Sequence, residues 1–177
     1  MTTATTTTTT TDTHDADYRW VPTLGFGAHL RQLLTATGLP WRVLALAAGV
    51  SPLTVERLLG AGRPLSRIRA RDARRLLRLD PRSLRALGQC QVSARGTATR
   101  IAALLTAGVP ETRLAAELGI GRDEMIALAT GRARQCSEMV RLRTRAACQS
   151  HRLWTCMDDD AEDEPGIERD TEGEEAC

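Results

Sequence analysis

The sequence predicts an all-α protein in which one helical unit occurs twice. Alanine, leucine and arginine, which favour helices, dominate its 177 residues. Aromatic residues make up 3% of the chain, and no β-branched or aromatic run alternates with polar residues, so we expect no strands. The third observation is a pattern of small and apolar residues in segment 41–60 that returns in segment 111–130.

Segment 41–60 reads as a helix, a sharp turn and a second helix. Gly49 can adopt the left-handed conformation that turns the chain, and Val50 bridges the turn. Ser51 can cap the second helix, and Pro52 suits its first turn. The inward apolar positions are Leu44, Ala45, Ala48, Val55, Leu58 and Leu59. A small fifth residue and a glycine at the ninth position let two helices cross closely, which is the pattern of a helix-turn-helix motif.

The same pattern returns 70 residues later in segment 111–130. The matching positions hold Leu114, Ala115, Leu118, Gly119, Ile120, Met125 and Leu128. The preceding residues 38–40 (Gly-Leu-Pro) also match residues 108–110 (Gly-Val-Pro). Two copies in one chain predict two tandem helix-turn-helix units with about four helices each.

A first helix precedes each motif. In the first unit it covers 27–36 and ends at Gly38, and in the second unit it begins near Thr97. Its inward residues are Leu30, Leu33 and Leu34 in the first copy and Ile101, Leu104 and Leu105 in the second. We therefore expect these helices to cover the motif on the same side in both units.

A fourth helix follows each motif. In the first unit we expect it over 66–79, capped by Ser66, with Ala73, Leu76 and Leu77 buried. The opposite face then carries Arg67, Arg71, Arg74 and Arg78. In the second unit Ser137 caps a helix that reaches about Trp154, and Ala147 and Cys148 take the places of Leu76 and Leu77.

The remaining segments set the domain boundaries. Asp80 and Pro81 begin a short helix that stops at Gly88. We expect a first unit over 25–88, a linker over 89–96, a loop over 131–136 and a second unit over 97–156. The threonine-rich residues 1–20 and the acidic residues 157–177 have the composition of disordered tails.

Charge is segregated along the chain. Residues 18–156 hold 23 arginines against 8 acidic residues, whereas residues 157–177 hold 11 acidic residues and one arginine. All basic side chains are arginine, because the chain has no lysine. A basic body indicates a polyanionic partner. The acidic tail either improves solubility or competes with that partner for the arginines.

The second helix of the first motif is the candidate DNA reader. In DNA-binding motifs of this kind that helix lies in the major groove, where its side chains meet base edges. The candidate base contacts are Ser51, Pro52, Leu53, Thr54, Glu56 and Arg57. The candidate phosphate contacts are Arg42, Arg63, Arg67, Arg71 and Arg74.

The second motif has a poorer surface for DNA. Asp123 and Glu124 would approach phosphates with like charge, and Ile126 is apolar where DNA favours a donor. Its candidates for a second reader are Arg122, Arg132 and Arg134. Two alternatives stay open: a second half-site reader, or a copy used for packing or dimerisation.

The chain resembles the small tandem helix-turn-helix proteins of actinobacteria and their phages over roughly residues 25–155. The segments that carry the resemblance are L-P-W-R-V-L-A-L-A-A-G-V-S-P-L-T-V-E-R-L-L (39–59), G-R-P-L-S-R-I-R-A-R-D-A-R-R-L-L (62–77), T-R-I-A-A-L-L-T-A-G-V-P-E-T-R-L-A-A-E-L-G-I (99–120) and R-L-W (152–154). The resemblance implies a DNA-binding regulator. The chain departs from it at Asp123, Glu124 and Ile126 and in its acidic tail.

Other classes of protein fit the sequence less well. We expect no secretion signal and no membrane span, because the N-terminus lacks basic and apolar regions and no apolar run is long enough. The five cysteines indicate a reducing cytoplasm. Cys136, Cys148, His151 and Cys156 are close in sequence but lack a C-x2-C pair, so we expect no metal and no cofactor. The sequence has no activated nucleophile and no Gly-rich phosphate loop after a strand, so we do not expect an enzyme.

The sequence therefore predicts a cytoplasmic, nucleoid-associated protein that binds double-stranded DNA and regulates transcription. Further candidate partners are a second copy of the chain, in a homodimer, and components of RNA polymerase. The alternative is a protein-interaction module, sigma-factor-like or anti-repressor, that keeps the fold without reading DNA. The charge around helix 51–60 favours DNA, and the charge around helix 121–130 favours a protein partner.

Overall fold

The computed structural model describes residues 19–153, which form nine helices and four short strands. The mostly helical class predicted from the sequence is confirmed. The predicted disordered tails lie outside the described residues, apart from Arg19 and Trp20. Within 19–153 no helix combines the length and the apolar character needed to cross a membrane.

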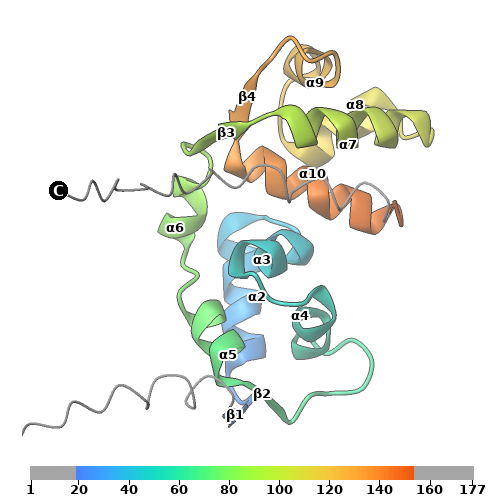
Figure 1. Cartoon of the computed structure of the whole chain (residues 1–177). Coiled ribbons are helices and arrows are strands. Elements are labelled where there is room, and N and C mark those ends of the chain that lie inside the picture. The colour runs from blue at the N-terminus through green and yellow to red at the C-terminus, as the bar shows by residue number, and fades with distance from the viewer. Residues whose placement is uncertain (1–18, 154–177) are drawn as a thin grey trace, which may run out of the picture.

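The same order of elements occurs twice along the chain (Figure 1). The first half contains β1 (Trp20–Pro22), α2 (Phe26–Thr37), α3 (Trp41–Ala48), α4 (Pro52–Leu58), β2 (Arg67–Arg69) and α5 (Ala70–Leu77). Helix α6 (Pro81–Ala86) then leads to the second half. That half contains β3 (Gln91–Ser93), α7 (Arg95–Thr106), α8 (Glu111–Leu118), α9 (Arg122–Ala129), β4 (Gln135–Ser137) and α10 (Glu138–Ser150).

The expectation that the chain has no strands was wrong. Strand β1 pairs antiparallel with β2, and β3 pairs antiparallel with β4. Val21 lies opposite Ile68, and Val92 lies opposite Cys136. Each strand has three residues, so one inward residue between two outward ones is the whole pattern. Such a short alternation gives no periodic signal in a helix-rich sequence.

These strands correct several predicted boundaries. The helix expected over 66–79 covers 70–77, because residues 67–69 form β2, and the prediction that Ser66 caps it was therefore wrong. Arg67 therefore lies on a strand and does not share a helix face with Arg71, Arg74 and Arg78. The predicted linker 89–96 contains β3 and the start of α7, and the loop expected over 131–136 ends in β4. Leu77, expected in the core, is 61% exposed.

The strands also correct the alignment of the fourth helices. Ile68 and Cys136 are the buried central residues of β2 and β4, so the two halves match there at an interval of 68 residues. This interval places Thr144, and not Ala147, at the position of Leu76. The difference arises because residues 59–66 connect α4 to β2, whereas the shorter segment 130–134 connects α9 to β4.

The connection between α3 and α4 recurs between α8 and α9, as predicted. Gly49 and Gly119 both adopt the left-handed conformation, with φ of 61° and 68°. The following residue returns toward the preceding helix in each copy, since Val50 N donates to the Ala45 carbonyl at 2.9 Å and Ile120 N to the Ala115 carbonyl at 3.2 Å. A residue with a Cβ adopts this conformation only at a cost.

Three predicted helix starts have different outcomes. Asp80 forms a capping box with Ser83: its Oδ1 accepts the Ser83 N–H at 2.7 Å, and Ser83 Oγ accepts the Asp80 N–H at 3.1 Å. That Ser83 N–H holds the pKa of Asp80 below its usual range. Ser137 caps α10 by accepting the Val140 N–H at 3.2 Å. Ser51 stands at the start of α4, but its side chain makes no capping bond, so this prediction was wrong.

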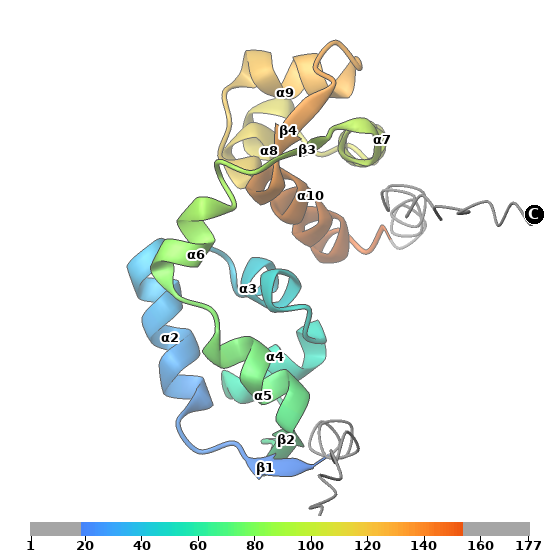
Figure 2. The same cartoon turned by 60° about the vertical axis from the view of Figure 1, so that its left-hand side comes forward.

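The two halves have separate hydrophobic cores, and α10 contributes to both. The first core contains Leu30, Val43, Leu44, Val55 and Leu76, and the second contains Ile101, Leu104, Leu114, Met125 and Leu128. From α10, Leu142 and Ala146 pack into the first core, whereas Val140, Ala147 and Cys148 pack into the second. Figures 1 and 2 both show α10 between α3 on one side and α7 and α8 on the other.

Truncation of the α10 residue that enters the first core tests this arrangement. Leu142 is 4% exposed, so Leu142→Ala leaves a cavity between α10 and the first half. We expect the free energy of unfolding to fall by about 2–5 kcal/mol. Equilibrium urea denaturation measures this change. Ser150→Ala, at an exposed position of the same helix, is the control and should change stability by less than about 0.5 kcal/mol. Equal effects of the two substitutions would contradict the shared role of α10.

Candidate nucleic-acid interface

Helix α4 presents one ridge to solvent. Val55 is fully buried against the first core, and the opposite side of the helix carries Leu53 and Arg57, which are one turn apart. Leu53 is 52% exposed although it is apolar. Thr54 and Glu56 flank this ridge and are half-buried, as is Arg57. Pro52 lies one turn before Val55, toward the buried side, and the exposed Ser51 precedes the helix. Four of the six predicted base contacts therefore lie on or beside the outer side of α4.

Helix α5 is tied to the turn that precedes α4. The Arg75 Nη1 atom donates a hydrogen bond of 2.7 Å to the carbonyl oxygen of Gly49. Arg71 and Arg78 lie one turn before and after Arg75, so they share its stripe on α5. Both are exposed, and so is Arg74 one position further round the helix. The predicted phosphate contacts Arg71 and Arg74 thus lie on the helix that is fastened to the α3–α4 turn.

The strand pair β1–β2 places Trp20 and Arg69, which were not among the predicted contacts, beside the predicted phosphate contact Arg67. Trp20 lies opposite Arg69, and Pro22 lies opposite Arg67. Both arginines are exposed, and Trp20 is 60% exposed. The alternation Arg-Ile-Arg at 67–69 was the available signal, but a helix was expected there. The outward surface of this ribbon therefore combines an indole with two guanidinium groups.

Two predicted phosphate contacts have different surroundings. Arg63 is exposed in the connection between α4 and β2. Arg42 lies in the first turn of α3, at the end of that helix away from the α3–α4 turn. Its guanidinium carbon is 4.3 Å from the centre of the Trp41 ring, and its side chain lines a pocket shared with α8 and α10. The structure therefore does not bring Arg42 together with the other candidates.

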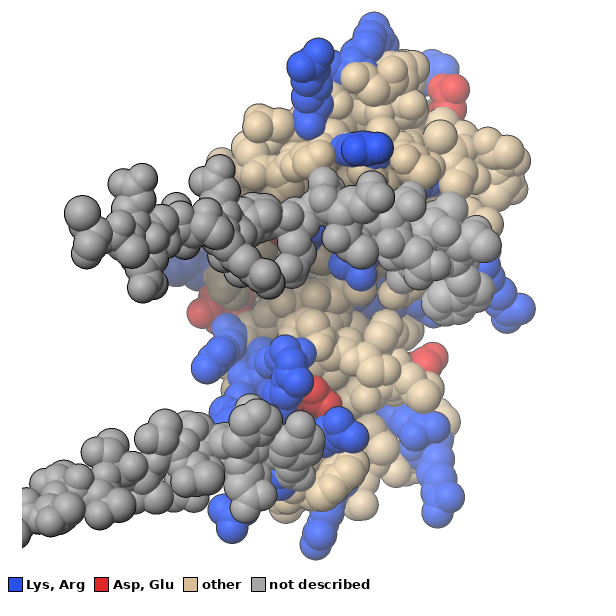
Figure 3. All heavy atoms as spheres, viewed as in Figure 1, with Lys and Arg blue, Asp and Glu red and all other residues tan. Residues whose placement is uncertain are grey.

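Basic charge is concentrated in the first half. Residues 19–88 contain thirteen arginines and three acidic residues, whereas residues 89–153 contain ten arginines and five acidic residues. Figure 3 shows basic side chains gathered over the lower part of the molecule, around α5 and the β1–β2 ribbon and near α4, with few acidic side chains among them. This surface would attract a polyanion such as nucleic acid.

The corresponding surface of the second half differs in charge and in chemistry. Arg122 at the start of α9 donates to Glu111 at 2.7 Å, and Arg132 donates to Thr130 Oγ1 at 3.1 Å. Asp123 and Glu124 are exposed beside Arg122, and Arg134 is exposed in the segment before β4. The β3–β4 ribbon holds Gln91, Ser93, Gln135 and Ser137, where the first half holds Trp20, Pro22, Arg67 and Arg69. The second-reader candidates are therefore partly engaged within the chain.

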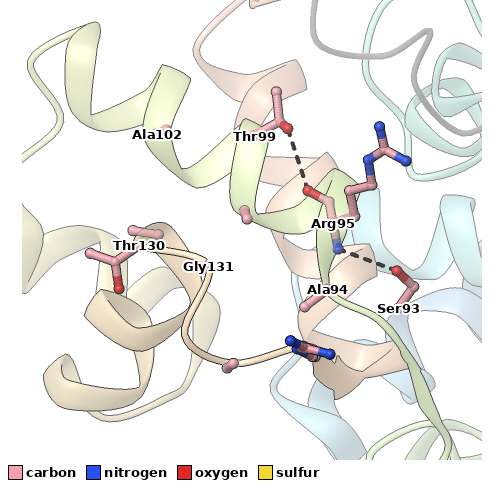
Figure 4. Close-up of a pocket in the computed structure, with 11 residues that line it drawn as sticks. Ser93, Ala94, Arg95, Thr99, Ala102, Thr130 and Gly131 are labelled. Atoms are coloured by element: carbon pink, nitrogen blue, oxygen red, sulfur yellow. Dashed lines mark hydrogen bonds between the residues drawn. The ribbon is translucent and has the colours of Figure 1, made fainter.

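The second half also has a groove where the first half is closely packed. A cavity of about 610 Å³ lies between the start of α7 and residues 129–134 after α9. Figure 4 shows Thr130 and Gly131 on one side of it and Ser93, Arg95 and Thr99 on the other. In the first half, Gly27 of α2 lies so close to the end of α4 that a Cβ there would be 2.5 Å from the Leu58 carbonyl oxygen. Its counterpart Ala98 lines the groove.

The cysteine and histidine residues considered as metal ligands do not come together. Cys136 and Cys148 are buried in the second core, and His151 Nε2 lies 3.6 Å from a Glu117 oxygen. Cys156 lies outside the described residues. Burial raises the pKa of the Cys136 thiol, which donates to Thr97 Oγ1 at 3.6 Å. Across 19–153 no three His, Cys, Asp or Glu side chains are placed to hold a metal ion.

Comparison of the chain with protein-family models, with curated proteins and with solved structures gave no match.

The close approach of α2 and α4 gives a test of how α4 is positioned. In a helix, glycine to alanine usually gains up to about 1 kcal/mol of stability. Gly27→Ala should instead lose about 1–3 kcal/mol, because the new methyl group meets the Leu58 backbone oxygen.

Thermal and urea unfolding measure the effect of Gly27→Ala. The matched control is Ala98→Gly at the start of α7, which removes a methyl group that borders open space and should cost no more than about 1 kcal/mol. A Gly27→Ala protein as stable as the wild type would show that α2 and α4 are not in close contact.

Proposed function

We propose that the protein binds double-stranded DNA through its first half and regulates transcription in the nucleoid. In this proposal α3 and α4 form a helix-turn-helix motif, and α4 enters the major groove. The observation that carries the proposal is the exposed outer ridge of α4 in a half with thirteen arginines and three acidic residues. Leu53 is exposed one turn from Arg57, on a helix that is held in place by Val55 in the core. An apolar side chain exposed in this position favours a binding surface over a face that only contacts water.

The residues of α4 suit base edges in the major groove. Arg57 would donate two hydrogen bonds to guanine O6 and N7, and Leu53 would contact a thymine methyl group. The Ser51 side chain makes no capping bond to α4, and its hydroxyl would donate to a base or a phosphate. Glu56 would accept from cytosine N4, and Thr54 suits either kind of contact. Pro52 fixes the start of the helix.

The phosphate contacts come from the elements that flank α4. Arg63 is in the connection after α4, and Arg71 and Arg74 are on α5, which Arg75 fastens to the Gly49 carbonyl. The β1–β2 ribbon adds Arg67 and Arg69, with Trp20 beside them. Such contacts set the register of a protein on DNA but carry no sequence information. Arg42 is left out of this set because it faces a different pocket.

The second half, in this proposal, is a tandem copy of the motif that supports the first half through α10. The pairing of Arg122 with Glu111 and the exposed Asp123 and Glu124 oppose an approach of α9 to phosphates. One observation favours a second candidate function, binding of a partner protein through α9. Ile126 and Ala127 line a cavity of about 430 Å³ together with Asp123 and Arg132, and this mixed surface suits a protein more than DNA.

Two arginine variants separate base contact from phosphate contact. Arg57→Ala should weaken binding to a preferred duplex by about 1–3 kcal/mol, roughly 5- to 150-fold, with little effect on random duplex DNA. Arg71→Ala should weaken binding to both by a similar, smaller factor. Fluorescence anisotropy with labelled duplexes at two salt concentrations measures these affinities. Losses of the same size on both duplexes for both variants would contradict the assigned roles.

The β1–β2 ribbon gives a second test through salt dependence. The double variant Arg67→Gln/Arg69→Gln should lower the slope of log affinity against log salt by about 2, because two phosphate contacts are lost. The matched control is Arg82→Gln/Arg85→Gln, which removes the same charge from two exposed positions on α6 that are not predicted to contact DNA. If the control lowers the slope as much as the ribbon variant does, the effect comes from overall charge and the ribbon does not contact DNA.

A further inference from the structure

A second basic site lies between the two halves, away from α4. Helices α3, α8 and α10 enclose a pocket of about 280 Å³ (their arrangement is visible in Figures 1 and 2). Its polar and aromatic lining consists of Trp41 and Arg42 from α3, Arg113 and Glu117 from α8, and Arg143 and Ser150 from α10. Both halves of the molecule therefore contribute to one cavity.

The charges in this pocket are not balanced. Three arginines, Arg42, Arg113 and Arg143, line it together with one acidic residue, Glu117. Glu117 Oε1 accepts from Arg113 Nε at 2.9 Å, and its Oε2 lies 3.6 Å from His151 Nε2. The carboxylate is therefore already shared by two basic groups and does not neutralise Arg42 or Arg143.

Arg143 is the most confined of the three arginines. Its Nε atom is buried and has no hydrogen-bond partner among residues 19–153. Its guanidinium lies over the turn after α8, where a methyl group at Gly119 would collide with it. Burial lowers the pKa of Arg143, the direction expected for a cation removed from water. An arginine in this position gains stability from an anion that restores the lost hydration.

The first turn of α3 opens on the same pocket. Pro40 precedes this helix and offers no side-chain cap, and the first backbone bonds are from Val43 N and Leu44 N to the Pro40 carbonyl. The N–H groups of Trp41 and Arg42 thus remain without partners inside the helix. The positive end of the helix dipole adds to the charge of the arginines.

We infer that this pocket binds the phosphate group of a small phosphorylated molecule, with Arg113 and Arg143 donating to its oxygens and Arg42 and Trp41 forming the wall. Arginine suits this role because its planar guanidinium can donate two hydrogen bonds to one tetrahedral anion. The inference does not depend on the proposed binding of DNA by α4. A ligand held here would contact α3 of the first half and α8 and α10 of the second, and would stabilise their arrangement.

The test uses the full chain and inorganic phosphate or pyrophosphate as the ligand, at constant ionic strength maintained with sodium chloride. Trp20→Phe/Trp154→Phe leaves Trp41 as the remaining tryptophan, so its fluorescence reports on the pocket. We expect a saturable fluorescence change and a rise of Tm with ligand. Arg113→Gln and Arg143→Gln should each weaken the affinity about tenfold or more, because each removes charged hydrogen bonds.

The control is Arg82→Gln, which removes an exposed arginine on α6 and should leave the affinity unchanged. Arg113 is exposed, so its variant keeps the test valid if the Arg143 variant does not fold. No saturable response, or an equal loss in the Arg82 variant, would overturn the inference. The inference would also be overturned if the Arg113 and Arg143 variants lost affinity for duplex DNA but kept their affinity for pyrophosphate. The site would then bind phosphates of the DNA backbone.

Discussion

The fold depends on the packing of α10 into two hydrophobic cores. Leu142 and Ala146 complete the first core, and Ala147 and Cys148, on the other side of the helix, complete the second. A half of about 60–70 residues can bury only a limited core by itself. Packing of α10 against both halves therefore contributes much of the stability of each half. This packing also creates the pocket lined by Arg143.

A second constraint is the glycine turn in each half, against which the fourth helix places an arginine. Arg75 donates to the Gly49 carbonyl, whereas the Arg143 guanidinium lies over Gly119, and Arg143 also lines the pocket between the halves. The same left-handed glycine turn thus lies beside an arginine in both halves, but the surroundings of that arginine differ. In the first half the outer ridge of α4, formed by Leu53 and Arg57, lies among arginines, and the proposed DNA binding rests on this ridge. In the second half ion pairs such as Arg122–Glu111 use the charges internally.

The turns could be predicted from Gly49 and Gly119, and most apolar faces from the helical spacing of inward residues in helices of six to thirteen residues. The strands could not, since three residues such as 67–69 are too few to show a period. The missed strands in turn misplaced Arg67 and Leu77 and hid Trp20 and Arg69. Arg42 was grouped with the reader because it is near in sequence, although it lies at the other end of α3.

The central claim is that α4 reads base edges in the major groove. Selection from random duplex DNA, followed by methylation of guanine N7 in the selected sites, tests it most directly, because N7 lies in that groove. We expect an enriched sequence in which methylation of at least one guanine blocks binding by the wild type but not by Arg57→Ala. Binding with no enriched sequence, or with no sensitivity to N7 methylation, would contradict major-groove reading by α4.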